Sequence, residues 1–173
     1  MRTRLVFAAG LAAALAAGAA QAHVVFAQSE ARAGAHWAGA LRVGHGCKGG
    51  LATTSIRVEI PEGINVARPQ PKPGWTVKVE RQPLAEPALH EGKPITERVR
   101  ALVWTGRLPD EQFDEFGLAA KLPAEPGALA FKVIQTCEGG EARWTEIPVA
   151  GAPRPEFPAA MLTLKAADGG HAH

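Results

Sequence analysis

Thr54-Ser55-Ile56-Arg57-Val58-Glu59-Ile60 is the stretch that decides the fold. Its isoleucines and valine alternate with polar residues, and a period of two places every second side chain on the same face of an extended strand. Pro61 and Gly63 follow at once and end the run. The stretch therefore predicts a β-strand with one buried face and one solvated face.

Similar short runs flank this strand on both sides, separated by glycine and proline, and no segment has the periodicity of an amphipathic helix. About nine short strands with turn signals between them predict an all-β, antiparallel β-sandwich. One long strand is expected over 128–137. Residues 82–95 contain three prolines and are expected to form a polar surface loop.

The N-terminal segment has the pattern of a secretion signal. Arg2 and Arg4 precede an apolar run over 5–19, and Ala20 and Ala22 occupy the −3 and −1 positions of a small-x-small cleavage site. A retained membrane anchor is disfavoured because the run is shorter than the ~20 residues that a spanning helix needs. We therefore expect cleavage after Ala22 and a periplasmic or secreted protein.

Length and charge limit the class of the exported chain. Removing 22 of the 173 residues leaves 151, enough for one domain with a sizeable core. The signal holds two of the 19 basic residues and none of the 17 acidic ones, so the remainder is balanced and lacks a basic nucleic-acid surface. We expect a signal over 1–22, one domain over 23–167 and a flexible tail over 168–173, with no membrane anchor in the mature chain.

Cys47 and Cys137 are the two cysteines of the chain. In an exported protein such a pair favours a disulfide, here closing a loop of 90 residues that is worth roughly 4–5 kcal/mol in the chain-entropy model. The alternative is a soft metal site with two thiolate ligands.

His23 would become the first residue of the mature protein. Its free α-amino group and imidazole can bind one metal ion together, and copper(II) has the highest affinity for such nitrogen donors. A carboxylate would complete the ligand set, and Phe113-Asp114-Glu115-Phe116 offers two acidic residues between phenylalanines. These acids could instead lie in a solvated turn, and Trp144 could be an ordinary core residue.

The remaining histidines are weaker candidates. His45 is expected to form local hydrogen bonds in a glycine-rich loop, and His171 and His173 could bind metal loosely in the tail. The chain has no Gly-x-Ser-x-Gly, His-Glu-x-x-His, P-loop or dinucleotide-binding motif, so we do not expect an enzyme.

Taken together, six stretches make the chain resemble the YcnI-like family of periplasmic or cell-surface copper-binding domains. They run in the family's order through most of the sequence: His23-Val24-Val25-Phe26, His45-Gly46-Cys47, Ile60-Pro61-Glu62-Gly63, Pro69 to Trp75, Leu108 to Phe116, and Gln135 to Trp144.

The resemblance implies a sandwich of immunoglobulin-like or cupredoxin-like type that carries a monohistidine brace for copper(II). It assigns His23 and Glu115 as ligands, places Trp144 beside the metal and joins Cys47 to Cys137. It also implies copper trafficking, delivery or buffering, with a copper transporter or another periplasmic copper protein as partner. Some members carry a C-terminal membrane anchor, and we expect none in this chain.

Two other functions stay open. A copper-dependent oxidative enzyme would need a second histidine in the brace, from His36, His45 or His90. A structural, adhesion-like sandwich would bind no metal.

Overall fold

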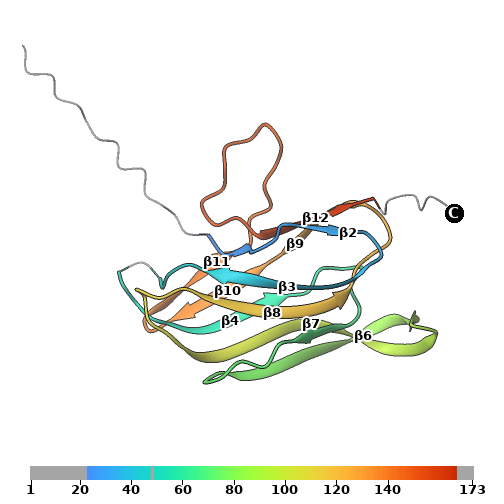
Figure 1. Cartoon of the computed structure of the whole chain (residues 1–173), viewed down its shortest axis with the longest axis horizontal. Helices are drawn as coiled ribbons and strands as arrows, with labels where there is room; N and C mark the ends of the chain where they lie inside the picture. The colour runs from blue at the N-terminus through green and yellow to red at the C-terminus, as the bar shows by residue number, and fades with distance from the viewer. Residues whose placement is uncertain (1–22, 48, 167–173) are drawn as a thin grey trace, which may run out of the picture.

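The computed structural model describes residues 23–47 and 49–166, which form twelve strands and no helix. The strands make sheets of four, five and three strands (Figure 1). In spatial order the four-stranded sheet contains β1 (Val25–Phe26), β3 (His36–Val43), β8 (Asp114–Lys121) and β5 (Ala67–Pro69). The five-stranded sheet contains β11 (Gly140–Trp144), β10 (Val133–Cys137), β4 (Thr53–Glu59), β7 (Lys93–Leu108) and β6 (Thr76–His90). The small sheet contains β2 (Glu30–Arg32), β12 (Ala160–Lys165) and β9 (Gly127–Phe131).

The core lies between the four-stranded and five-stranded sheets. β4 confirms the predicted alternation, because Ile56 and Val58 are fully buried while Arg57 between them pairs with Glu80 on the outer side. The rings of Trp104 on β7 and Phe116 on β8 meet edge to face, with centroids 5.7 Å apart. The predicted all-β sandwich is therefore confirmed, with antiparallel pairing throughout the two large sheets.

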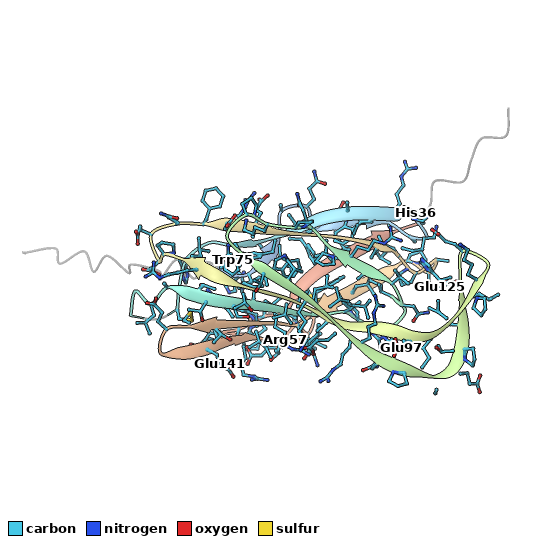
Figure 2. All side chains as sticks on the ribbon, turned by 90° about the horizontal axis from the view of Figure 1, so that it is seen from below. His36, Arg57, Trp75, Glu97, Glu125 and Glu141 are labelled. Carbon is cyan, nitrogen blue, oxygen red and sulfur yellow. A yellow bond between two sulfur atoms is a disulfide. The ribbon has the colours of Figure 1, made fainter. Side chains whose placement is uncertain are left out.

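The predicted loop over 82–95 is wrong, because β6 and β7 form one long hairpin there. Glu91 and Gly92 have φ values of 52° and 75°, as in a tight turn with two left-handed residues. β6 is an edge strand, where a proline's missing N–H costs no ladder hydrogen bond, and the register shifts between Pro83 and Ala88. Figure 2 shows Glu97 on this hairpin at one end of the molecule and Glu141 at the other.

The predicted single strand over 128–137 is two strands. β9 pairs with β12 in the small sheet, and β10 pairs with β4 and β11 in the five-stranded sheet. Lys132 lies between them, and its carbonyl accepts a hydrogen bond from the Glu59 amide at 2.9 Å. The chain thus passes from one sheet to the next without a turn signal.

The Cys47–Cys137 disulfide is present, which confirms the predicted pairing and excludes a two-thiolate metal site. Cys137 ends β10 in the five-stranded sheet, while Cys47 lies in the loop that follows β3 of the four-stranded sheet. Their Cα atoms are 6.0 Å apart across 90 residues of sequence. The bridge therefore connects the two large sheets at one end of the sandwich.

Candidate metal site

His23 lies two residues before β1, which is at the edge of the four-stranded sheet. The side chains of Val24 and Phe26 are 1% and 5% exposed and anchor this segment in the core. β1 pairs with β3 through Val25 and Arg42, and Val25 is exposed on the outer face. The apolar pattern of the segment thus fixes the position of His23 through its neighbours.

The imidazole of His23 contacts Trp144, the last residue of β11. The ring centroids are 5.8 Å apart with an interplanar angle of 60°. Trp144 is 5% exposed and also packs against Phe157, at a centroid distance of 5.3 Å. Trp144 is therefore a core residue, as the simpler interpretation held, and it is also a neighbour of His23.

Arg154 also contacts the imidazole of His23. Its Nη2 atom lies 3.5 Å from Nδ1 of the imidazole. Because a guanidinium has no acceptor, Nδ1 is the acceptor in this contact. His23 and Arg154 also line a shallow, mostly apolar cavity with Val25 and Met161.

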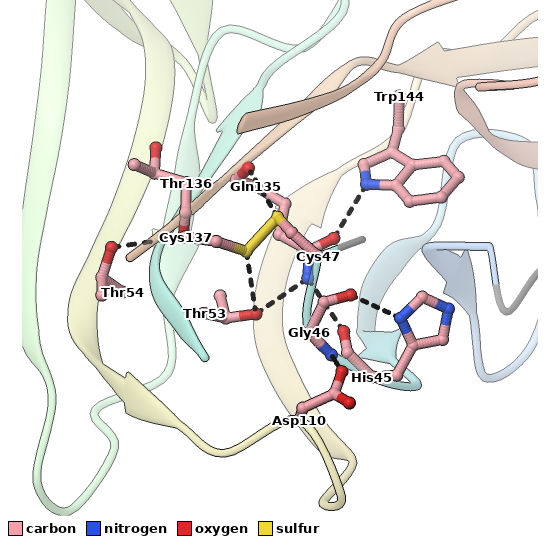
Figure 3. Close-up of a disulfide and its surroundings, with 10 residues drawn as sticks. All are labelled: His45, Gly46, Cys47, Thr53, Thr54, Asp110, Gln135, Thr136, Cys137 and Trp144. Atoms are coloured by element: carbon pink, nitrogen blue, oxygen red, sulfur yellow. Dashed lines mark hydrogen bonds between the residues drawn. A yellow bond between two sulfur atoms is a disulfide. The ribbon is translucent and has the colours of Figure 1, made fainter. Parts of the chain in front are cut away.

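Gln135 fixes the orientation of Trp144 through a buried hydrogen-bond network (Figure 3). Its Oε1 accepts the indole N–H of Trp144 at 3.0 Å, and its Nε2 donates to the His45 carbonyl at 2.9 Å and to the Thr53 hydroxyl at 2.8 Å. Gln135 is 1% exposed, so its amide replaces water for all three partners. The network links the disulfide region to the side chain that packs against His23.

The loop between β3 and the disulfide is held by local polar contacts. The imidazole Nδ1 of His45 contacts the Gly46 carbonyl, and the Gly46 amide donates to the Asp110 carboxylate at 2.9 Å. Gly46 allows this approach because a Cβ atom at its position would lie 2.1 Å from the Leu51 carbonyl oxygen. His45 thus forms the local hydrogen bond expected from the sequence.

Glu115 is paired with Arg42 on the neighbouring strand. Arg42 Nε and Nη2 donate to Oε1 of Glu115 at 3.0 and 2.7 Å, while Oε2 accepts no hydrogen bond from the described residues. Val25, Arg42 and Glu115 lie directly opposite one another across β1, β3 and β8. Glu115 is therefore two strands from β1, a spacing of roughly 10 Å.

The structure thus brings His23 and Trp144 into contact but does not bring Glu115 to His23. In the described part of the chain, no three His, Cys, Asp or Glu side chains gather in a group that could hold a metal ion. A brace needs no such group, since one histidine supplies two donors.

The other histidines lie apart from this contact. His36 begins β3, and its Nε2 is 3.5 Å from Glu91 in the β6–β7 turn; His36, His90 and Glu91 line a separate cavity there. The proposed secondary ligands His171 and His173, and the signal over 1–22, lie outside the described residues.

Sequence reasoning missed the partners of the site residues. Arg42, Gln135 and Arg154 lie 73, 9 and 131 residues from the side chains that they contact. Each contact is set by strand register or loop packing, for which the local sequence carries no signal. Only Gln135 carried a signal in the sequence, because it is a polar residue that follows two apolar residues, Val133 and Ile134, in a predicted strand.

Comparisons with known proteins agree with the fold. The model of the family described as a domain of unknown function, DUF1775, matches residues 23–164. The chain is similar to a solved protein from Nocardia farcinica, described as uncharacterized with an immunoglobulin-like fold, at 28% identity and a TM-score of 0.63. That match covers 82% of this chain and 97% of the other. No curated protein sequence matches the chain.

The described residues contain no helix that is long and apolar enough to span a membrane. The family match covers most of the chain and confirms the resemblance to the YcnI-like domains at the level of the family. The chain belongs to the DUF1775 family.

Proposed function

We propose that this protein is exported and binds copper(II) through His23 and Glu115, in order to carry or buffer copper rather than to catalyse a reaction. The observation that carries the proposal is the contact between His23 and the buried indole of Trp144. The family match begins at His23, the residue that the predicted cleavage would expose. An N-terminal histidine with a fixed ring is suited to chelation by its amine and its imidazole.

The residues at the site fit a copper(II) ion chemically. Copper(II) favours nitrogen and oxygen ligands in a tetragonal arrangement. His23 would supply nitrogen, and the Glu115 carboxylate would supply oxygen, since its Oε2 accepts no hydrogen bond from a described residue. The bound ion would act as cargo, held by these donors.

Two arginines would have to move before His23 and Glu115 could bind the same ion. Arg154 must leave Nδ1 of His23, and the Arg42–Glu115 pair must shift so that the carboxylate can reach the edge strand. Both pairs are partly exposed, and such contacts contribute under about 1 kcal/mol.

Trp144 would shield one side of the ion from solvent. Its ring is buried and held by Gln135, so it stays in place whether or not metal is bound. A transporter or another periplasmic copper protein would receive the metal from the exposed side, where Arg154 and Val25 lie. No other histidine of the described residues makes a ring contact or hydrogen bond with His23, so we favour binding over the oxidative chemistry of a two-histidine brace.

The test is copper(II) titration of the mature protein and of its Glu115→Gln and Trp144→Phe variants, followed by electron paramagnetic resonance. We expect one tight site in the parent, weaker binding after Glu115→Gln and an altered spectrum after Trp144→Phe. An unchanged affinity and spectrum in the Glu115→Gln variant would show that another group completes the site.

A further inference from the structure

A second cavity, of about 490 Å³, opens where β4 leaves the five-stranded sheet. β4 pairs with β7 as far as Glu59 opposite Ala101, and β10 begins only at Val133. Residues of β7 and of β9 line the cavity, together with the segment that follows β4. The side chains that surround this cavity determine what it can hold.

Arg98 forms one wall, and its guanidinium is largely buried with one exposed counter-ion. It is 9% exposed, and its Nη2 donates to the carbonyls of Ile60 and Pro61 at 2.7 and 2.9 Å. Its Nε is buried and has no hydrogen-bond partner among the described residues. The nearest paired carboxylate, Glu62, lies 3.7 Å from Nη1 and is 96% exposed.

Such an arrangement is unfavourable unless something else neutralises the charge. Burying a guanidinium is energetically costly when it lacks a hydrogen-bonded anion, so buried charges in native proteins are normally paired. The two carbonyls fix the side chain in place, which prevents Arg98 from relaxing into solvent. A rigid, underneutralised guanidinium is a preformed anion-binding group.

Two further cations line the same cavity. Arg100 and Lys132 form no ion pair with a described residue, whereas Glu59, which also lines it, is bound by Arg57 at 3.1 Å. Three cations against the carboxylates of Glu59 and Glu62 leave a net charge of +1. One negative charge on a ligand would balance the cavity.

Apolar side chains form another part of the wall, beside the polar Gln82. Ile60, Leu129 and Ile147 line the cavity, and Ile147 is 54% exposed although it is a large hydrophobic residue. The volume lies within the range of about 300–1,000 Å³ that is typical of small-molecule sites. We propose that this cavity binds a small organic monoanion, with its carboxylate at Arg98, Arg100 and Lys132 and its apolar part against Ile60, Leu129 and Ile147.

The experiment uses the metal-free mature protein and calorimetric titration with octanoate, octanol and inorganic phosphate. We expect saturable one-to-one binding of octanoate and at least tenfold weaker binding of octanol and of phosphate. The Arg98 Nε–H resonance should shift on addition of octanoate, because the guanidinium to which it belongs gains an anionic partner. Equal affinity for octanol, equal affinity for phosphate, or no shift of that resonance would overturn the proposal.

Surface variants keep the test independent of folding. Arg100→Gln and Lys132→Gln should each weaken octanoate binding about threefold, since each removes one partly exposed charge. The exposed Lys121, on β8 outside the cavity, provides a matched control, and Lys121→Gln should leave the affinity unchanged. Unaltered binding in the Arg100→Gln, Lys132→Gln double variant would place the anion elsewhere.

Discussion

Replacing Gln135 by leucine should destabilise the protein far more than the loss of one polar side chain suggests. The change removes the acceptor of the Trp144 indole N–H and the donor to the His45 carbonyl, in a position that is 1% exposed. Each buried group left without a partner costs about 1–3 kcal/mol, and the added apolar surface offsets part of the sum. We expect a net loss of about 2–4 kcal/mol in the free energy of unfolding.

Urea denaturation followed by tryptophan fluorescence measures this loss, and the matched control is Thr136→Val on the same strand. The hydrogen bond at Thr136 goes from the Thr54 hydroxyl to the main-chain carbonyl of Thr136, which the substitution keeps. Thr136→Val should therefore change the free energy of unfolding by less than about 0.5 kcal/mol. The melting temperature of the Gln135→Leu variant should fall by roughly 5–15 °C. A loss below about 0.5 kcal/mol would refute the view that this network fixes the side chain beside His23.

Three further outcomes follow from the fold and the site. Replacing Cys47 and Cys137 together by serine should lower the free energy of unfolding by roughly 4–5 kcal/mol in urea denaturation, because the loop spans 90 residues; a loss below 1 kcal/mol would contradict this. Trp104→Ala should cost about 3–5 kcal/mol by the same assay, since the ring is fully buried against Phe116, and a variant of near-native stability would be evidence against this packing. Glu115→Gln should change the stability by less than about 1 kcal/mol, because its pair with Arg42 is partly exposed, yet weaken copper(II) binding; a large loss of stability would assign Glu115 a structural role instead.

Local patterns predicted the parts of the fold that depend on local chemistry. Alternation over Thr54–Ile60 gave a strand whose apolar side chains are buried, and the cysteine pair gave the disulfide. The hairpin over 82–95 was not predictable in this way. Proline normally breaks a strand, and only the position of β6 at a sheet edge makes it tolerable there.

The candidate site shows the same limit. That His23 begins the mature protein stays a prediction from the cleavage pattern, and the contact of His23 with Trp144 agrees with the resemblance to the YcnI-like domains. The pairing of Glu115 with Arg42 depends on the register of β3 against β8, which brings together residues 73 positions apart. Register arises from the packing of whole strands. No short motif therefore predicts that Arg42 pairs with Glu115, where a metal would have to displace it.

The most direct test of the account compares two proteins, one beginning at His23 and one with a single extra alanine before it. Copper(II) titration and electron paramagnetic resonance are applied to both. The extra residue turns the His23 amine into an amide, which is a poor ligand, and leaves the imidazole, Glu115 and the core intact. We predict a tight one-to-one site with nitrogen coupling in the first protein and its loss in the second. Equal binding by both would contradict the brace and place the metal at other residues.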